Sequence, residues 1–194
     1  MNNIICETID VRDLTLDTTE LSGRLRTPAP LDSEVIRDCI ARVSEVCRPR
    51  YCYAKTSVSA DVLGECQLDF MAINSVSLAK ALADCSSAYV AAVTLGIEVD
   101  RLIARLAITS KAKSFIADGV ASALAEAAME QVNGLLPSQC LKERYSVGYG
   151  DFVLSYQAHV LDFLKADKLL GIKLSESYIM TPRKSVTAVI GVKK

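Results

Sequence analysis

Apolar residues recur at helical spacing in several parts of the chain. A helix is predicted from Asp32 or Ser33 to Val46, because its apolar positions repeat every three or four residues: Val35, Ile36, Ile40, Val43 and Val46. Residues 97–107 and 111–136 show a similar pattern and predict two more helices, the second being the longest element of the chain. A short helix is expected to start at Ser77, and another is expected over residues 154–168.

Other stretches have the composition and length of strands. Residues 51–62 and 67–73 are rich in Tyr, Thr and Val and predict a hairpin around Gly64. Residues 87–95 form a nearly continuous apolar run, which is typical of a central strand. Strand and turn are expected over residues 3–21, and two further strands over 172–180 and 185–192, joined across Pro182. Strands and helices that do not alternate regularly indicate an α+β fold.

Composition limits the classes of protein to consider. The 194 residues are 51% hydrophobic and contain no linker, so residues 1–194 are expected to form a single domain. The 22 basic and 23 acidic residues are interspersed, which argues against a nucleic-acid or anionic-membrane surface. No apolar run reaches transmembrane length, and the first residues lack the pattern of a signal peptide, so a cytoplasmic location is expected.

The seven cysteines are scattered and include no Cys-x-x-Cys pair. An odd number of cysteines in a non-secreted chain argues against a disulfide framework, so they are expected to be small buried hydrophobic residues. His159 is the only histidine and has no cysteine at zinc-finger spacing. Nucleophilic catalysis by a Cys-His pair is disfavoured, because no catalytic motif surrounds any cysteine.

Residues 144–151 concentrate chemistry that could hold a small molecule. Arg144 offers a planar set of donors that suits a carboxylate or a phosphate. Tyr145 and Tyr149 offer aromatic faces, and Gly148 and Gly150 allow backbone angles or close approaches that other residues do not. The alternative is a tight turn between two elements, with an exposed arginine and half-buried tyrosines.

Two carboxylates on the long predicted helix are a second candidate. Asp118 and Glu126 are eight residues apart, which places them near one face of a helix. They could form an acidic site for the ammonium group of a ligand, or they could be two solvated surface carboxylates.

Four motifs in order carry a resemblance to a known family. They are Thr94-Leu95-Gly96, Asp118-Gly119 together with Leu124-Ala125-Glu126-Ala127, the Arg144–Tyr149 stretch, and residues 171–186 with Tyr178-Ile179-Met180-Thr181-Pro182 inside them. From about residue 85 to its end, the chain resembles the activation (reactivation) domain of cobalamin-dependent methionine synthase. It is most similar to the short, stand-alone members of that family.

The resemblance implies a mixed, largely antiparallel sheet with helices packed on it. It also implies an S-adenosylmethionine-binding protein that supports reductive remethylation of cobalamin, with a flavodoxin-like electron donor. By the same resemblance, Arg144 would bind the carboxylate of the ligand and Glu126 would lie beside its amino-acid part. The backbone at Ser146 and Gly148, together with Tyr149, would line the adenosyl site.

The chain departs from the family pattern at Val147, where a proline is usual, and an acidic residue that the family uses near its start cannot be placed. His159 lacks the Asp-x-His-x-x-Gly motif of corrinoid-binding modules. Cobalamin is therefore expected on a partner, either methionine synthase or another corrinoid protein, with this chain as an accessory component acting in trans.

Two other functions remain open. One is a docking scaffold for a corrinoid methyltransferase that has lost S-adenosylmethionine binding. The other is an ordinary small-molecule methyltransferase, which is disfavoured because the glycine-rich turn and the βα alternation of that fold are missing.

Overall fold

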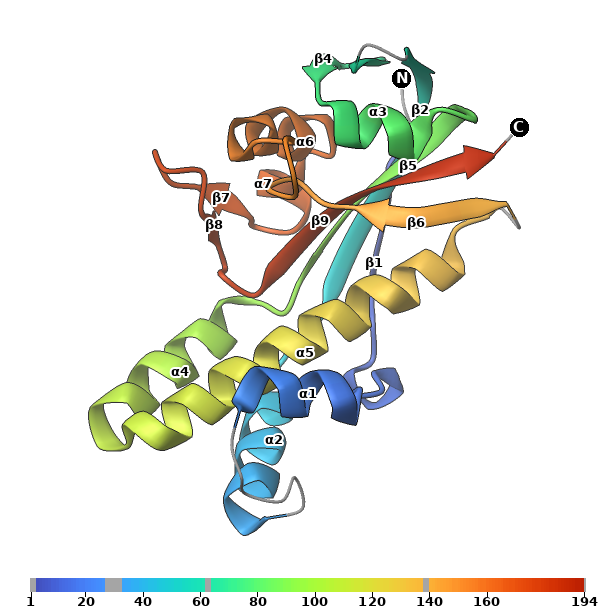
Figure 1. Cartoon of the computed structure of the whole chain (residues 1–194). Helices are drawn as coiled ribbons and strands as arrows, with labels where there is room; N and C mark the ends of the chain where they lie inside the picture. The colour runs from blue at the N-terminus through green and yellow to red at the C-terminus, as the bar shows by residue number, and fades with distance from the viewer. Residues whose placement is uncertain (1–2, 27–32, 62–63, 138–139, 194) are drawn as a thin grey trace.

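An antiparallel sheet runs through the middle of the molecule (Figure 1). The computed structural model describes residues 3–26, 33–61, 64–137 and 140–193. Seven strands of this described part form the sheet, in the order β4-β3-β2-β5-β9-β6, with β1 also paired to β2. Their bounds are β1 Ile5–Thr8, β2 Arg50–Ala60, β3 Glu65–Leu68, β4 Met71–Asn74, β5 Cys85–Thr94, β6 Leu141–Tyr145 and β9 Ser185–Lys193. The pairings are antiparallel, which confirms the predicted α+β class.

The central strand is β5, as its apolar run predicts. It pairs with β2 on one side and with β9 on the other. Side chains alternate between the two faces of a strand, and β5 is covered on both. Tyr89 and Val93 contribute to one buried cluster, whereas Val90 and Ala92 contribute to a second cluster on the opposite face.

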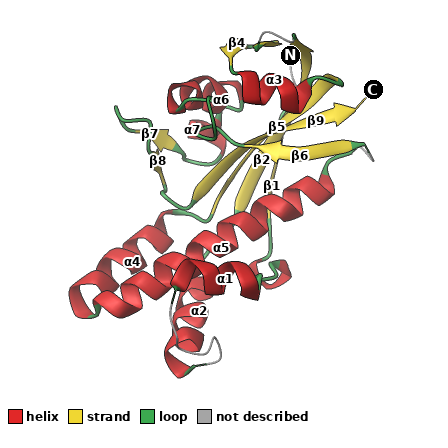
Figure 2. Ribbon diagram, in the orientation of Figure 1, coloured by secondary structure: helices red, strands yellow, loops and turns green. Residues whose placement is uncertain are grey.

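Helices cover the two faces of the sheet (Figures 1 and 2). On one face lie α1 Thr18–Leu25, α2 Glu34–Val46, α4 Ile97–Thr109 and α5 Lys111–Leu135. On the other lie α3 Val76–Leu82, α6 Gln157–Phe163 and α7 Ala166–Leu169. A small hairpin of β7 Lys173–Leu174 and β8 Met180–Thr181 precedes β9, and the short 3-10 helices η1 Val11–Asp13 and η2 Leu154–Tyr156 complete the described elements.

Small residues let α5 pack closely against its neighbours. Ala117, Ala121 and Ala128 are fully buried in the cluster that α5 shares with the sheet. A Cβ atom at Gly119 would lie 2.8 Å from Cδ2 of Leu25, so the glycine lets α1 lie directly on α5. This contact brings the N-terminal segment beside the long helix.

Several predicted elements are confirmed, including α2, α3, α4, α5 and β5. Ser33 is the N-cap of α2, whereas Asp32 lies outside the described residues. The predicted hairpin exists as β2 and β3, but the chain turns again to form β4, so the second strand is shorter than expected. Val62 also lies outside the described residues.

Three predicted elements are wrong in part. Residues 3–21 were expected to be strand and turn, but Asp17 accepts hydrogen bonds from the amides of Thr19 and Glu20 and starts helix α1. The helix expected over 154–168 is divided, because Lys165 adopts a φ of 50° between α6 and α7. The strand expected over 172–180 has only two residues in β7, since Ser175 accepts hydrogen bonds that close the next residues into a turn.

Five of the seven cysteines are buried, as predicted, but Cys6 is half-buried and Cys140 is exposed. Burial raises the pKa of Cys47 and of Cys52 to about 12, so both thiols are protonated and unreactive at neutral pH. Among the described residues, none of the helices combines the length and apolarity needed to cross a membrane.

Candidate functional site

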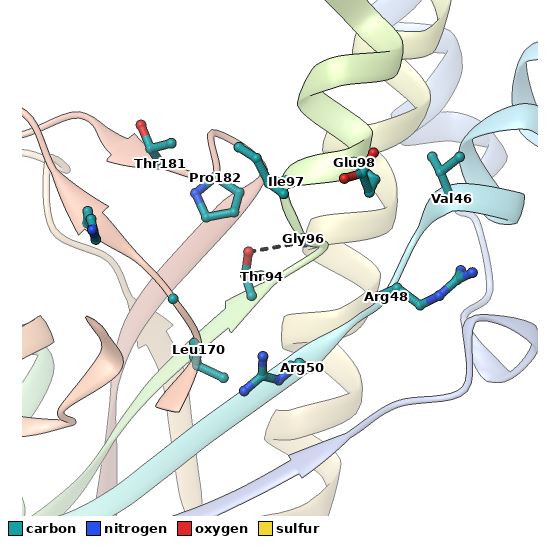
Figure 3. A pocket seen from close by; sticks show the side chains of 12 residues that line it. Val46, Arg48, Arg50, Thr94, Gly96, Ile97, Glu98, Leu170, Thr181 and Pro182 are labelled. Carbon is teal, nitrogen blue, oxygen red and sulfur yellow. Dashed lines mark hydrogen bonds between the residues drawn. The ribbon is translucent and has the colours of Figure 1, made fainter. Parts of the chain in front are cut away.

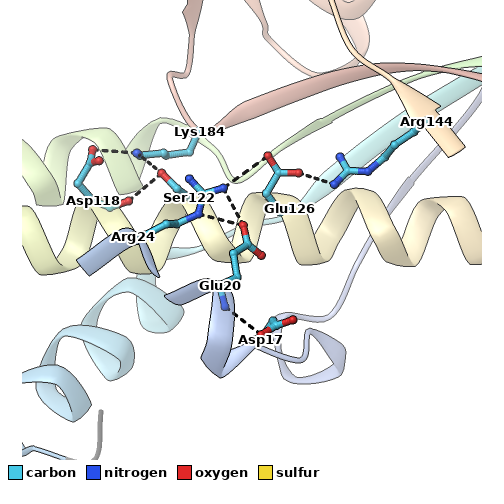
Figure 4. Close-up of polar contacts among 8 residues, drawn as sticks. All are labelled: Asp17, Glu20, Arg24, Asp118, Ser122, Glu126, Arg144 and Lys184. Atoms are coloured by element: carbon cyan, nitrogen blue, oxygen red, sulfur yellow. Dashed lines mark hydrogen bonds and ion pairs between the residues drawn. The ribbon is translucent and has the colours of Figure 1, made fainter. Parts of the chain in front are cut away.

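Arg144 and Glu126 face one another between β6 and α5 (Figure 4). Nη2 of Arg144 donates to Oε2 of Glu126 at 2.6 Å, so the guanidinium and the carboxylate form an ion pair. The two side chains are 28% and 24% exposed, which keeps the pair partly screened from water yet open to a ligand. The sequence alone does not predict this pairing, because Arg144 and Glu126 meet only where β6 crosses α5 in the folded chain.

Helix α1 brings a second arginine to the same carboxylate. Nη2 of Arg24 lies 3.8 Å from Oε1 of Glu126 and 2.7 Å from Oε1 of Glu20 (Figure 4). Neither Arg24 nor Glu20 was predicted to belong to the site, because residues 3–21 were expected to form strand and turn and no helix was expected over Arg24. Asp17, the N-cap of a helix, was the local signal that could have revealed them.

Asp118 has a cation of its own. Its Oδ1 lies 2.8 Å from Nζ of Lys184, which also donates to the Ser122 hydroxyl at 2.8 Å (Figure 4). Asp118 and Glu126 therefore do not share an uncompensated acidic site. Instead, carboxylates and cations alternate along this side of α5.

The chain after β6 turns on two glycines. Gly148 has φ of 94° and Gly150 has φ of 54°, in the region that favours glycine. The amide of Gly148 donates to the Phe152 carbonyl at 2.7 Å, and the amide of Tyr149 donates to the Ser146 carbonyl at 3.3 Å. A Cβ atom at Gly148 would lie 2.9 Å from Cδ2 of Leu154, so both space and backbone angle require glycine there.

Asp151 fixes the far end of this turn to helix α3. Its carboxylate accepts from the Ser75 hydroxyl at 2.5 Å and from the amides of Val76 at 2.7 Å and Ser77 at 3.2 Å. These hydrogen bonds, that of Ser75 first, lower the pKa of Asp151 to about 2. The aspartate therefore anchors the turn, a role that the sequence did not reveal.

The two tyrosines of the stretch differ in exposure. Tyr149 is 65% exposed, so its ring is accessible to a planar ligand. Tyr145 is half-buried, and its hydroxyl donates to the Tyr149 carbonyl at 3.4 Å. The turn alternative is therefore correct for the backbone, but Arg144 lies in strand β6 rather than in the turn and is only partly exposed.

Comparison with known proteins gives a strong structural likeness but no match in sequence. No family model matches the chain, and no curated protein sequence matches it. Among solved structures, it superposes with a TM-score of 0.72 on the "MetH Reactivation Domain bound to AdoHcy". The match covers 98% of this chain and 78% of that one at 15% sequence identity.

The chain has the fold of the MetH reactivation domain. This finding confirms the predicted α+β fold of the activation-domain type. Within this reactivation-domain fold, the sequence-predicted site residues come from three consecutive places: Glu126 from α5, Arg144 from β6, and Ser146, Gly148 and Tyr149 from the following turn.

The alternating charges of the site suit a zwitterionic ligand. In Arg144, Nη2 donates to Glu126, and Nε lies 4.0 Å from Oε2 of Glu130, so the planar guanidinium keeps donors for a further acceptor. Glu126 can accept from an ammonium group if Arg24 moves from its 3.8 Å position. A guanidinium, a carboxylate and an exposed aromatic ring thus lie on neighbouring elements.

Proposed function

We propose that this chain binds S-adenosylmethionine between α5 and β6 and supports reductive remethylation of cobalamin held by a partner protein. The observation that carries the proposal is the Arg144–Glu126 pair, which lies directly before the glycine turn of residues 146–150. The fold supports it, because the similar reactivation domain is described as bound to AdoHcy, an analogue of S-adenosylmethionine.

Each part of the proposed ligand has a matching group in this chain. Arg144 binds the carboxylate with its remaining donors, and Glu126 accepts from the ammonium group. The backbone of Ser146 and Gly148 lines the adenosyl part, and the exposed Tyr149 ring offers a face to the adenine or to the sulfonium. The ligand, when bound, supplies the methyl group.

The cobalamin in this proposal belongs to methionine synthase or to another corrinoid protein. The only histidine, His159, lies exposed on α6 and lacks the corrinoid-binding motif. The chain therefore acts in trans in the cytoplasm, presenting S-adenosylmethionine to the partner, while a flavodoxin-like protein supplies the electron.

A second candidate is a docking scaffold that does not bind S-adenosylmethionine. It is favoured by the completeness of the ion-pair network, because Glu126 and Arg144 already satisfy one another and Arg24 adds a second cation. A ligand must compete with these contacts, whereas a docking protein would use them only to stabilise its fold.

A reactivation assay tests the proposal. The purified chain is added to methionine synthase inactivated in the cob(II) state, with its own activation domain removed, together with S-adenosylmethionine and a flavodoxin reducing system. The chain is expected to speed the return of the methylcobalamin spectrum, and to show no cobalamin absorbance when purified alone. Arg144→Ala should abolish the acceleration, whereas the control Arg105→Ala, an exposed arginine on α4, should preserve it.

Two results would refute the proposal. One is tight binding of cobalamin by this chain alone. The other is remethylation that runs equally fast with and without the chain for both methionine synthase and a corrinoid methyltransferase protein.

A further inference from the structure

A separate cavity of about 440 Å³ lies at the other end of β9 from Arg144 (Figure 3). Its lining comes from the ends of α2, β5 and α7, the starts of β2 and α4, and the β7–β8 hairpin. Thr94 in the lining pairs with Ser185, whereas Arg144 pairs with Ile190. Five residues of strand separate these positions by roughly 17 Å, so the cavity is distinct from the proposed S-adenosylmethionine site.

Positive charge predominates in this cavity. Arg48, Arg50 and Lys173 line it, and within the described part of the chain none of the three makes an ion pair. Glu98, the acidic residue among the described lining residues, is already paired with Arg101 at 2.5 Å. The three cations therefore leave an uncompensated charge that favours an anion.

The arginines are held in place by the backbone. Arg50 is half-buried and donates from Nη2 to the Leu169 carbonyl, and its guanidinium lies beside Leu170 in Figure 3. Arg48 donates from Nη1 to the carbonyls of Glu45 at 2.8 Å and Cys47 at 2.7 Å, and in Figure 3 its guanidinium points away from Arg50, on the side of Val46. A guanidinium has five N–H donors, so Arg50 keeps donors for a bound anion.

The remaining walls are apolar. Val46, Ile97, Leu170 and Pro182 line the cavity between the charged groups. Helix α4 begins here, and its N-cap Gly96 provides no side-chain hydrogen bond to the first turn, so the positive end of the helix adds to the field of the cations. A volume of this size suits a small organic molecule rather than a bare ion.

We propose that this cavity binds a phosphate monoester that carries a small apolar group. Arg50, Lys173 and the positive end of α4 offer positive charge and donors to the phosphate, and the aliphatic walls cover the apolar group. A carboxylate satisfies only part of this arrangement because it carries a single charge. This site is independent of the proposed S-adenosylmethionine site and does not require that proposal to be correct.

The test uses phenyl phosphate as the probe, measured by calorimetric titration and by amide chemical shifts of the intact chain. Phenyl phosphate is expected to bind at one site and to shift the amides of Gly96 and Ile97. Benzyl alcohol, which lacks the charge, and inorganic phosphate, which lacks the apolar group, should each bind at least about tenfold more weakly. Benzoate should be intermediate.

Charge variants locate the site. Lys173 is exposed, so Lys173→Glu is expected to fold normally and to weaken phenyl phosphate binding about tenfold or more. Lys111→Glu, the same change at an exposed lysine outside the cavity, should leave the affinity within about twofold. Arg50→Gln, checked for folding by circular dichroism, should weaken binding as well.

The proposal is overturned if phenyl phosphate does not bind at millimolar concentration, or if benzyl alcohol or benzoate binds as tightly. It is also overturned if Lys173→Glu and Lys111→Glu have the same effect. S-adenosylmethionine binding should be unchanged by Lys173→Glu, so failure of one site is distinguishable from failure of the other.

Discussion

The charged side chains along α5 and those around the cavity at the start of α4 are partnered in opposite ways. Along α5, Glu126 lies between Arg24 and Arg144, and Asp118 is paired with Lys184. Around the cavity, the two arginines donate to backbone carbonyls, and none of the cations forms an ion pair with a described residue. A ligand at α5 must therefore exchange existing ion pairs, whereas an anion in the cavity neutralises charge that has no partner.

This difference predicts two kinds of selectivity. Exchange of ion pairs favours a ligand that brings both signs of charge, since a carboxylate alone would leave Glu126 competing for Arg144. Unpaired cations favour any anion of suitable size, and the apolar walls then select among anions. Substitutions at the α5 site and its neighbouring turn, or at the cavity, test the two regions separately.

The largest effect is expected from Arg144. Arg144→Ala should weaken S-adenosylmethionine binding by roughly 1.5–3 kcal/mol, because a hydrogen bond between charged groups is lost. Arg144→Lys should recover only part of this loss, because an ammonium cannot make two parallel hydrogen bonds to a carboxylate. Calorimetric titration measures both variants, and unchanged affinity in both would remove Arg144 from the site.

Asp151 tests whether the turn beside Arg144 must be anchored. Asp151→Asn should lower the melting temperature by a few degrees at neutral pH, because the carboxylate accepts three hydrogen bonds from α3 and its cap. The folded-state pKa of Asp151 is lowered to about 2, so its contribution is present above its ordinary pKa of about 4 and is lost as pH falls toward 2.

Thermal melts of both proteins between pH 7 and pH 2 check this dependence. The gap between native protein and variant should close as the pH falls through that window. A gap that stays constant with pH would show that Asp151 does not act through its charge.

Val147 tests how rigid the same turn is. Val147→Pro restores the residue usual in the resembled family and should raise the free energy of unfolding by about 0.4–1 kcal/mol, because proline restricts the unfolded chain. S-adenosylmethionine should bind equally well or more tightly. Val147→Ala is the control, since it removes the buried side chain without restricting the backbone. A large loss of stability in Val147→Pro alone would show that the backbone there does not suit proline.

The smallest effect is expected at the cavity. Glu98→Gln removes the acidic residue among the described lining residues and should strengthen phenyl phosphate binding by only about twofold, because Glu98 is already neutralised by Arg101. The same variant should not change S-adenosylmethionine binding. A tenfold change in phenyl phosphate affinity would show that Glu98 is not neutralised in solution.

The sequence predicts the parts of the fold that have a clear period. Helices α2, α4 and α5 and strand β5 are confirmed because their apolar residues recur at the spacing that burial requires. Helix α1 was missed, although Asp17 caps it, because its eight residues are largely polar. Over residues 172–180 a strand was predicted where there is mostly a turn. The apolar and polar residues there resemble a strand, but the chain turns around Ser175.

The sequence predicts individual residues of the candidate site, but not how they are paired. Arg144, Glu126 and the glycine turn were identified from their chemistry and from a resemblance, but the pairing of Arg144 with Glu126 depends on how β6 crosses α5. Arg24 and Lys184 could not be assigned, because α1 and the start of β9 reach α5 only in the folded chain. The cavity could not be predicted for the same reason, since elements far apart in the sequence form its lining.

Calorimetric titration of S-adenosylmethionine into the unmodified chain tests the central proposal most directly. The exchange of ion pairs at α5 predicts binding at one site per chain, with an affinity that falls by roughly 1.5–3 kcal/mol in Arg144→Ala and is unchanged in Arg105→Ala. No measurable binding at millimolar ligand, in a chain shown to be folded, would contradict the proposal and would favour the docking scaffold.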